Sequence, residues 1–185
     1  MSKEIFYIPN LLSIFRIILI IPVGYLLIYQ FEKSNTIVIF LLLLMYVTDL
    51  SDGYIARRLN QVTDFGKIID PLADKISLVI IALIIYFKGL IPTWFLLIVI
   101  LRDLLILSFG IYLKRKNRIT LMSNYPGKLA VFSIGLILLF SIINSELLLK
   151  INSFLYYIST TLILFSSYLY LIRFFKIIGE KNHGK

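Results

Sequence analysis

Long apolar runs separated by short polar segments dominate this sequence. A helix needs about 20 apolar residues to cross a bilayer, and each run is close to that length. In chain order, the predicted spans are Ile8–Gln30, Asn35–Arg57, Gly66–Phe87, Ile91–Leu113, Pro126–Ile143 and Ile151–Ile178. The pattern predicts an all-α protein, an integral membrane bundle of six transmembrane helices. We expect residues 1–185 to form a single membrane domain.

Composition supports this interpretation and narrows the chemistry. Hydrophobic residues make up 59% of the chain, whereas soluble domains average roughly 45–50%. The chain has no cysteine, which excludes disulfides, thiolate nucleophiles and sulfur-ligated metal sites. The only histidine, His183, lies in a polar tail, so we expect it to be solvated and not to bind a metal or take part in catalysis. Chemistry must therefore come from carboxylates, basic side chains and hydroxyls.

The positive charge of the chain indicates orientation in a membrane. The formal net charge is +9, but the basic residues are scattered and form no continuous stripe typical of nucleic-acid binding. The two most basic loops connect the second span to the third and the fourth to the fifth. Their basic residues are Arg57, Arg58, Lys67, Lys114, Arg115, Lys116 and Arg118. The positive-inside rule then places both termini and these loops on the cytoplasmic side.

Four of the ten acidic residues occur with helical spacing in the second and third spans. Asp49 and Asp52 are three residues apart, and Asp70 and Asp74 are four apart. Each pair therefore shares a helical face, and a short loop can bring the two pairs together. Bare carboxylates would repel one another, and oxygen-rich sites favour divalent cations. Two such ions can support in-line phosphoryl chemistry. The alternative is that these residues are caps or solvated charges, which would require four coincidences on adjacent helices.

Small and basic residues accompany the aspartates. Gly53 and Ala56 remove side-chain bulk beside the carboxylates, so a base or a pyrophosphate can approach the backbone. Arg57, one turn beyond Gly53, can bind a phosphate in bidentate fashion. Together these residues favour a nucleotide diphosphate as ligand.

Three further basic residues are candidates for binding a phosphorylated acceptor. Arg16 and Arg102 lie inside apolar spans, where an unpaired charge costs roughly 2.5–3.5 kcal/mol. Each needs an anionic ligand or an ion pair with a carboxylate, unless the long side chain of Arg16 extends to the membrane interface, and the sequence leaves these alternatives open. Lys128 follows Pro126 and Gly127 at a predicted helix start, a location that favours anions. Asn10 is interpreted as a cap of the first span in preference to a substrate contact.

The run DLSDGYIARRLNQVTDFGKIIDPLADK, Asp49 to Lys75, resembles the signature of the CDP-alcohol phosphotransferase (CDP-alcohol phosphatidyltransferase) family. It fits D-x₂-D-G-x₂-A-R-x₈-G-x₃-D-x₃-D at all eight fixed positions. IPNLLSIFR, LRDLLI and YPGK elsewhere look like phosphatidylglycerophosphate synthases and cardiolipin-synthase-type members. The specificity of the resemblance is concentrated in the signature.

The resemblance implies a function and a set of site residues. Asp49, Asp52, Asp70 and Asp74 would bind two divalent ions, Mg²⁺ or Mn²⁺, with Asp74 also the catalytic general base. The residues expected to contact the CDP moiety are Gly53, Ala56, Arg57 and Gly66.

The expected reaction transfers a phosphatidyl group from CDP-diacylglycerol to an alcohol, releasing CMP. Glycerol 3-phosphate is the preferred acceptor, with phosphatidylglycerol, inositol phosphate and serine as alternatives. The resemblance also implies a homodimer and a bacterial cytoplasmic membrane, with the active site facing the cytoplasm. The alternative outside the enzymes is a divalent-cation transporter. Transporters often contain inverted repeats, but here all four aspartates lie in one half of the chain, which disfavours this alternative.

Overall fold

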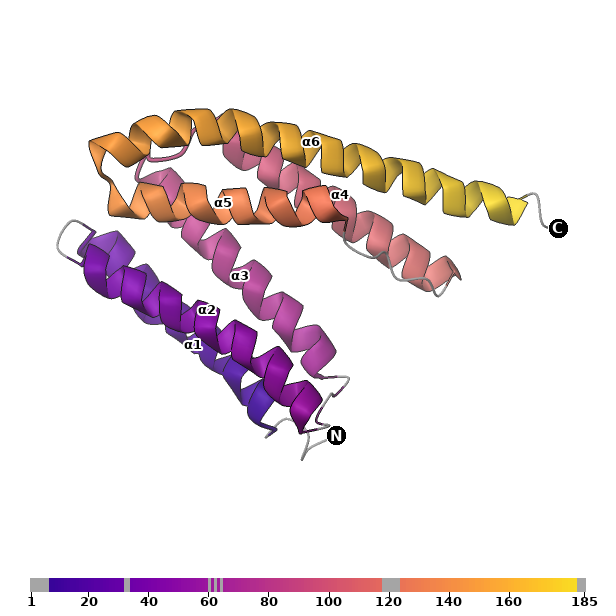
Figure 1. Cartoon of the computed structure of the whole chain (residues 1–185), viewed down its shortest axis with the longest axis horizontal. Coiled ribbons are helices and arrows are strands. Elements are labelled where there is room, and N and C mark those ends of the chain that lie inside the picture. Colours follow the sequence, from indigo (N-terminus) through magenta and orange to yellow (C-terminus); the bar gives the residue numbers. More distant parts are fainter. Residues whose placement is uncertain are drawn as a thin grey trace. The chain divides into compact units, whose positions relative to one another are not determined.

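The computed structural model describes residues 7–31, 34–59, 61, 63, 65–117 and 124–182. Within these ranges the chain forms six α-helices and no strand (Figure 1). They are α1 (Ile8–Tyr29), α2 (Asn35–Arg58), α3 (Gly66–Phe87), α4 (Thr93–Asn117), α5 (Tyr125–Ile143) and α6 (Glu146–Asn182). The predicted all-α class is confirmed, and the largest differences in bounds are the longer ends of α4 and α6. The expectations for His183 and Arg118 concern residues outside the described ranges.

Most of the helices are long and apolar enough to cross a membrane. Among the described residues, five helices meet this condition, namely α1, α2, α4, α5 and α6. Helix α3 does not, because Asp70, Asp74 and Lys75 fall within every 18-residue window of it. Large exposed side chains such as Ile21, Phe132 and Phe154 give the helices apolar outer faces typical of contact with lipid. The chain is therefore a multi-pass membrane protein, and the six-span count stays a prediction.

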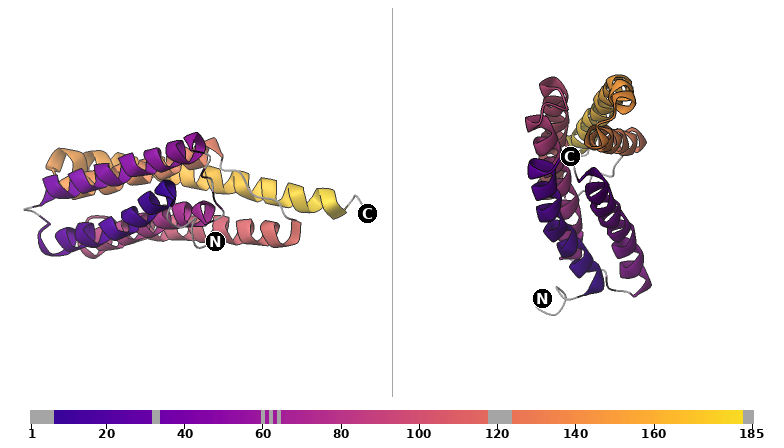
Figure 2. Two further views of the ribbon diagram at one scale, coloured as in Figure 1. Left: turned by 90° about the horizontal axis from the view of Figure 1, so that it is seen from below. Right: turned by 90° about the vertical axis from the view of Figure 1, so that its left-hand side faces the viewer.

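Helices α1, α2 and α3 belong to one compact unit, Met1–Lys88. In this unit α1 packs against both α2 and α3 (Figure 2). Val23, Leu27 and Ile85 are fully buried. The approach of α1 to α3 is close at Gly24, where a Cβ would lie 3.5 Å from Ile84 Cδ1. Helix α1 is thus the element that holds α2 and α3 together.

Helices α4, α5 and α6 belong to the second unit, Gly89–Lys185. Small polar residues line the contact between α5 and α6, where Ser133 Oγ donates to Ser159 Oγ at 2.9 Å. Asn152 of α6 donates to Ser141 Oγ at 3.1 Å in the same way. Such residues let membrane helices approach closely and hydrogen-bond across the interface. Helix α4 packs on α6 partly through aromatic rings, such as the Phe109–Phe174 stack with centroids 4.3 Å apart.

Candidate active site

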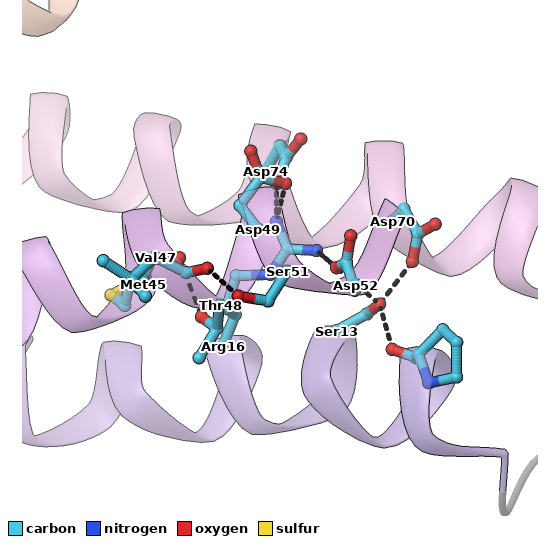
Figure 3. Close-up of polar contacts among 11 residues, drawn as sticks. Ser13, Arg16, Met45, Val47, Thr48, Asp49, Ser51, Asp52, Asp70 and Asp74 are labelled. Atoms are coloured by element: carbon cyan, nitrogen blue, oxygen red, sulfur yellow. Dashed lines mark hydrogen bonds and ion pairs between the residues drawn. The ribbon is translucent and has the colours of Figure 1, made fainter. Parts of the chain in front are cut away.

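The four spaced aspartates lie at facing ends of two helices. Asp49 and Asp52 lie in the last three turns of α2, and Asp70 and Asp74 lie in the first three turns of α3. The short connection from Arg58 to Gly66 makes these helix ends neighbours. Close up, the side chains from both helices turn toward α1 (Figure 3). The predicted convergence of the two pairs is present.

Arg16 of α1 binds three of the four carboxylates. Its Nη1 donates to Asp49 Oδ1 at 2.5 Å and also to Asp74 Oδ1, while its Nη2 donates to Asp52 Oδ2. Only 3% of the Arg16 side chain is exposed. A buried guanidinium is tolerated when it is paired and hydrogen-bonded in this way. Of the alternatives that the sequence left open for Arg16, the structure has the ion pair.

Ser13 binds the fourth carboxylate. Its Oγ lies within hydrogen-bond distance of Asp70 Oδ1, and more weakly of Asp52 Oδ2 at 3.4 Å and the Pro9 carbonyl at 3.1 Å. Because a hydroxyl has one proton, it donates to one of these acceptors at a time. Ser13 is fully buried. Helix α1 therefore positions all four carboxylates through two residues one turn apart.

The cluster has a closed side and an open side. Asp52 is 5% exposed, whereas the side chains of Asp49 and Asp74 are 41% and 53% exposed. The closed side faces Ser13 and Arg16. A ligand can therefore reach Asp49 and Asp74, whose side chains are the exposed ones.

The residues expected at the CDP moiety differ in their surroundings. At Gly53, the nearest atoms to an added Cβ would be the Arg57 guanidinium nitrogens, 3.9 Å and 4.0 Å away, so the space beside this glycine is open. Arg57 is exposed, and Ala56 is half-buried. Gly66 is buried and closely packed, since a Cβ there would lie 2.7 Å from Asn10 Oδ1 and 3.1 Å from Thr63 Oγ1.

Asn10 does not cap the first helix, so that interpretation was wrong. The N-cap residue of α1 is Tyr7. Asn10 instead donates to Thr63 Oγ1 at 3.1 Å, and Thr63 Oγ1 accepts the Gly66 N–H at 2.9 Å. The amide thus attaches α1 to the start of α3, because Gly66 leaves room for it.

Arg102 and Lys128, the other acceptor candidates, belong to the second unit. Arg102 Nη1 binds Asp103 Oδ1 at 2.6 Å, and Nη2 donates to the Gly127 carbonyl at 3.4 Å. Its side chain is 10% exposed. Lys128 is exposed in the first turn of α5, whose N-cap Asn124 accepts the Gly127 N–H at 2.7 Å. The structure pairs Arg102 with its chain neighbour, so the second alternative, an ion pair, is present here too.

Sequence reasoning missed Ser13, although a signal for it existed. Asn10, Ser13 and Arg16 follow one another at intervals of three in an otherwise apolar run, so they share one face of the helix. Polar residues on one face of a membrane helix point to the protein interior. That stripe is a signal from which the face of α1 that meets the site could have been predicted.

The donor set fits a hard divalent cation, although its present arrangement favours Arg16. Carboxylate and hydroxyl oxygens are the ligands that Mg²⁺ and Mn²⁺ prefer. Among the described residues, no three acidic or histidine side chains are arranged to hold a metal ion as they stand. The Oδ atoms of Asp49, Asp52 and Asp74 turn to the guanidinium instead. Metal binding therefore requires these carboxylates to reorient.

Comparison with known proteins identifies the family. Residues 6–174 match the sequence profile of the CDP-alcohol phosphatidyltransferases. A CDP-diacylglycerol–glycerol-3-phosphate 3-phosphatidyltransferase of Aquifex aeolicus is 33% identical over 181 residues, covering 94% of this chain and 99% of the relative. The enzyme of that name from Wigglesworthia glossinidia brevipalpis is 33% identical over 176 residues, covering 92% and 93%.

A relative from Mycobacterium tuberculosis, provisionally named a cardiolipin synthase, is 31% identical over 131 residues, 71% of this chain. The matched part of the chain spans only 62% of the length of that relative. The profile covers the first five helices, most of α6 and the aspartate signature. The chain therefore belongs to the CDP-alcohol phosphatidyltransferase family.

Proposed function

We propose that this protein transfers a phosphatidyl group from CDP-diacylglycerol to glycerol 3-phosphate, forming phosphatidylglycerophosphate and releasing CMP. The observation that carries the proposal is the convergence of four signature aspartates on α1, at one place in the fold. The relatives that match over nearly the whole chain bear the name of this activity. The acceptor follows from those names, and the reaction class follows from the family.

The carboxylates are proposed to act in two ways. Asp49, Asp52, Asp70 and Asp74 would hold two divalent ions, Mg²⁺ or Mn²⁺, which neutralise charge on the pyrophosphate when bound. Asp74, the most exposed of the three carboxylates bound to Arg16, takes the proton from the acceptor hydroxyl. The hydroxyl oxygen then forms a bond to the phosphorus carrying diacylglycerol, and the bond from that phosphorus to CMP breaks. The proton thus goes to Asp74 and CMP is the leaving group, so the reaction requires no protein nucleophile.

Binding of the donor is assigned to the end of α2 and the start of α3. The open space beside Gly53 suits close approach of the nucleotide, and Ala56 adds little bulk one turn later. The exposed guanidinium of Arg57 is free of the carboxylate cluster and suits a phosphate. Gly66 is packed on Asn10, so its contribution is the path of the backbone at the helix start.

Binding of the acceptor phosphate is assigned to Arg102 and Lys128. Arg102 is 10% exposed and has a buried Nε without a hydrogen-bond partner. Lys128 lies in the first turn of α5, where backbone N–H groups favour anions. Arg16 is engaged by three carboxylates and is left out of this assignment.

We extend the proposal to the setting of the enzyme. Six helices cross the cytoplasmic membrane of a bacterium, with both termini and the catalytic carboxylates on the cytoplasmic side, and the protein is a homodimer. The basic loops support the orientation, the near-full-length bacterial relatives support the membrane, and the family resemblance supports the dimer. Cysteine labelling from each side of the membrane tests the orientation, and the chain offers no native cysteine to interfere.

An acceptor panel tests the function. Purified protein is given CDP-diacylglycerol, Mg²⁺ or Mn²⁺, and one acceptor at a time, and CMP release is followed. We expect transfer to glycerol 3-phosphate, slowed by about 10²–10⁴ in Asp74→Asn. Transfer to phosphatidylglycerol alone would instead support the cardiolipin synthase alternative, which the mycobacterial relative's name favours. Inositol phosphate and serine are the other two acceptors tested. Cation flux without CMP release would support the transporter alternative and refute the proposal.

A further inference from the structure

Arg16 and a divalent cation would need the same carboxylates. The guanidinium takes one oxygen from each of three aspartates, Asp49, Asp52 and Asp74, which come from two different helices. Nη1 alone bridges α2 and α3 by binding Asp49 and Asp74. Because Arg16 is almost fully buried, these carboxylates are also the groups that allow its charge in the interior.

The carboxylates are oriented toward the guanidinium. As they stand, no three acidic side chains of the described residues could hold a metal ion together. Their oxygens are instead directed at Arg16 from three positions (Figure 3). A cation entering from the open side must draw some of these oxygens away from the guanidinium. It must also bind beside a fixed positive charge.

We infer that Arg16 is a positioning residue that serves as the counterion of the cluster, holding Asp49, Asp52 and Asp74 together while opposing the binding of divalent cations to them. The inference rests on the proposed function in taking these aspartates as metal ligands. A consequence is that metal and donor bind cooperatively, because the negative pyrophosphate offsets the repulsion from Arg16.

The test is Mn²⁺ binding by the full-length protein in lipid nanodiscs, with free Mn²⁺ measured by electron paramagnetic resonance. Arg16→Gln is expected to bind Mn²⁺ at least about tenfold more tightly than the wild type. In EDTA, the melting temperature of Arg16→Gln should be lower than that of the wild type. Addition of Mn²⁺ should raise the melting temperature of Arg16→Gln by more than it raises that of the wild type. Arg16→Lys, which keeps the charge, should retain affinity near the wild-type value.

A matched control separates this effect from loss of charge in general. Arg58 is exposed at the end of α2 and its guanidinium lies over the Tyr54 ring, 5.8 Å from the centroid. Arg58→Gln removes the same charge and should leave Mn²⁺ affinity unchanged. If Arg16→Gln does not fold, Arg16→Gln combined with Asp49→Asn removes one charge of each sign; recovery of folding supports the counterion role, and failure to recover refutes it.

The outcomes distinguish this inference from the proposed metal site. One outcome would overturn the inference alone. In it, the wild type and Arg16→Gln bind Mn²⁺ with equal affinity, and the melting temperature of Arg16→Gln lies below that of the wild type by the same amount in EDTA and in Mn²⁺. Arg16 would then have a structural role only. Lack of Mn²⁺ binding by both proteins would refute the metal site as well.

Discussion

The first turn of α5 is packed so closely around Gly127 that one methyl group should disturb it. A Cβ there would lie 2.6 Å from Asn124 Oδ1, 2.8 Å from Ser166 Oγ and 3.5 Å from Arg102 Nη2. Asn124 is the N-cap of α5, and Ser166 of α6 donates to its side chain at 2.8 Å. Gly127→Ala therefore places a methyl group inside the hydrogen-bonded contact of α5 with α6.

The magnitude follows from three terms. Loss of the Asn124 cap costs about 0.5–2 kcal/mol, and overpacking a filled site costs about 1–3 kcal/mol. Alanine returns roughly 0.5–1 kcal/mol relative to glycine inside a helix. The net destabilisation of Gly127→Ala is thus about 0.5–4.5 kcal/mol.

The assay is thermal unfolding of the purified protein, with Gly135→Ala as the matched control. Gly135 lies in the same helix, and an added Cβ there would meet nothing within 4 Å. Gly135→Ala should be neutral or slightly stabilising, while Gly127→Ala melts at a lower temperature. Because Arg102 contacts the Gly127 carbonyl, Gly127→Ala should also raise the acceptor KM. Equal stability of the two variants would refute the packing argument.

Three further predictions concern the site itself. Asp74→Asn should lower kcat for CMP release by about 10²–10⁴, the usual contribution of a general base, while circular dichroism stays unchanged. Ser13→Ala should lower the free energy of unfolding by about 1.5–3 kcal/mol, because it loses a hydrogen bond to a carboxylate of α3. Ser51→Ala, which loses only a bond to a backbone carbonyl of its own helix, should not. Equal melting temperatures of the two variants would contradict this prediction. Arg57→Gln should raise the donor KM and leave the acceptor KM unchanged, whereas the control Arg58→Gln should change neither. A rise of both KM values in Arg57→Gln would argue against the assignment of Arg57 to the donor.

Much of the fold follows from local patterns in the sequence. The predicted bounds of the third span, Gly66–Phe87, agree with α3, and the bounds of α1 and α2 differ from prediction at one end each. Apolar run length and flanking polar residues suffice here, because each membrane helix satisfies its backbone hydrogen bonds within its own segment. The pairing of aspartates within each helix is local for the same reason. Spacings of three and four residues fix a shared face.

The partners of Arg16 and Arg102 could not be predicted in this way. For both arginines an anionic ligand and an ion pair were open alternatives, and for Arg16 also a position at the membrane interface. Periodicity does not distinguish among them. Arg16 lies 33, 36 and 58 residues from the aspartates it binds. Arg102 binds its immediate neighbour Asp103, through side-chain rotamers that spacing alone does not specify.

The sequence by itself therefore determined the helices, the identity of the acidic residues and the family signature. Tertiary structure alone decided that α1 supplies Ser13 and Arg16 to a cluster whose acids come from α2 and α3. The physical reason is that hydrophobic periodicity encodes which face of a helix is buried. The rotation and depth at which two helices meet depend on close contacts such as Gly24 with Ile84 and Gly66 with Asn10, and these contacts exist only once the chain has packed.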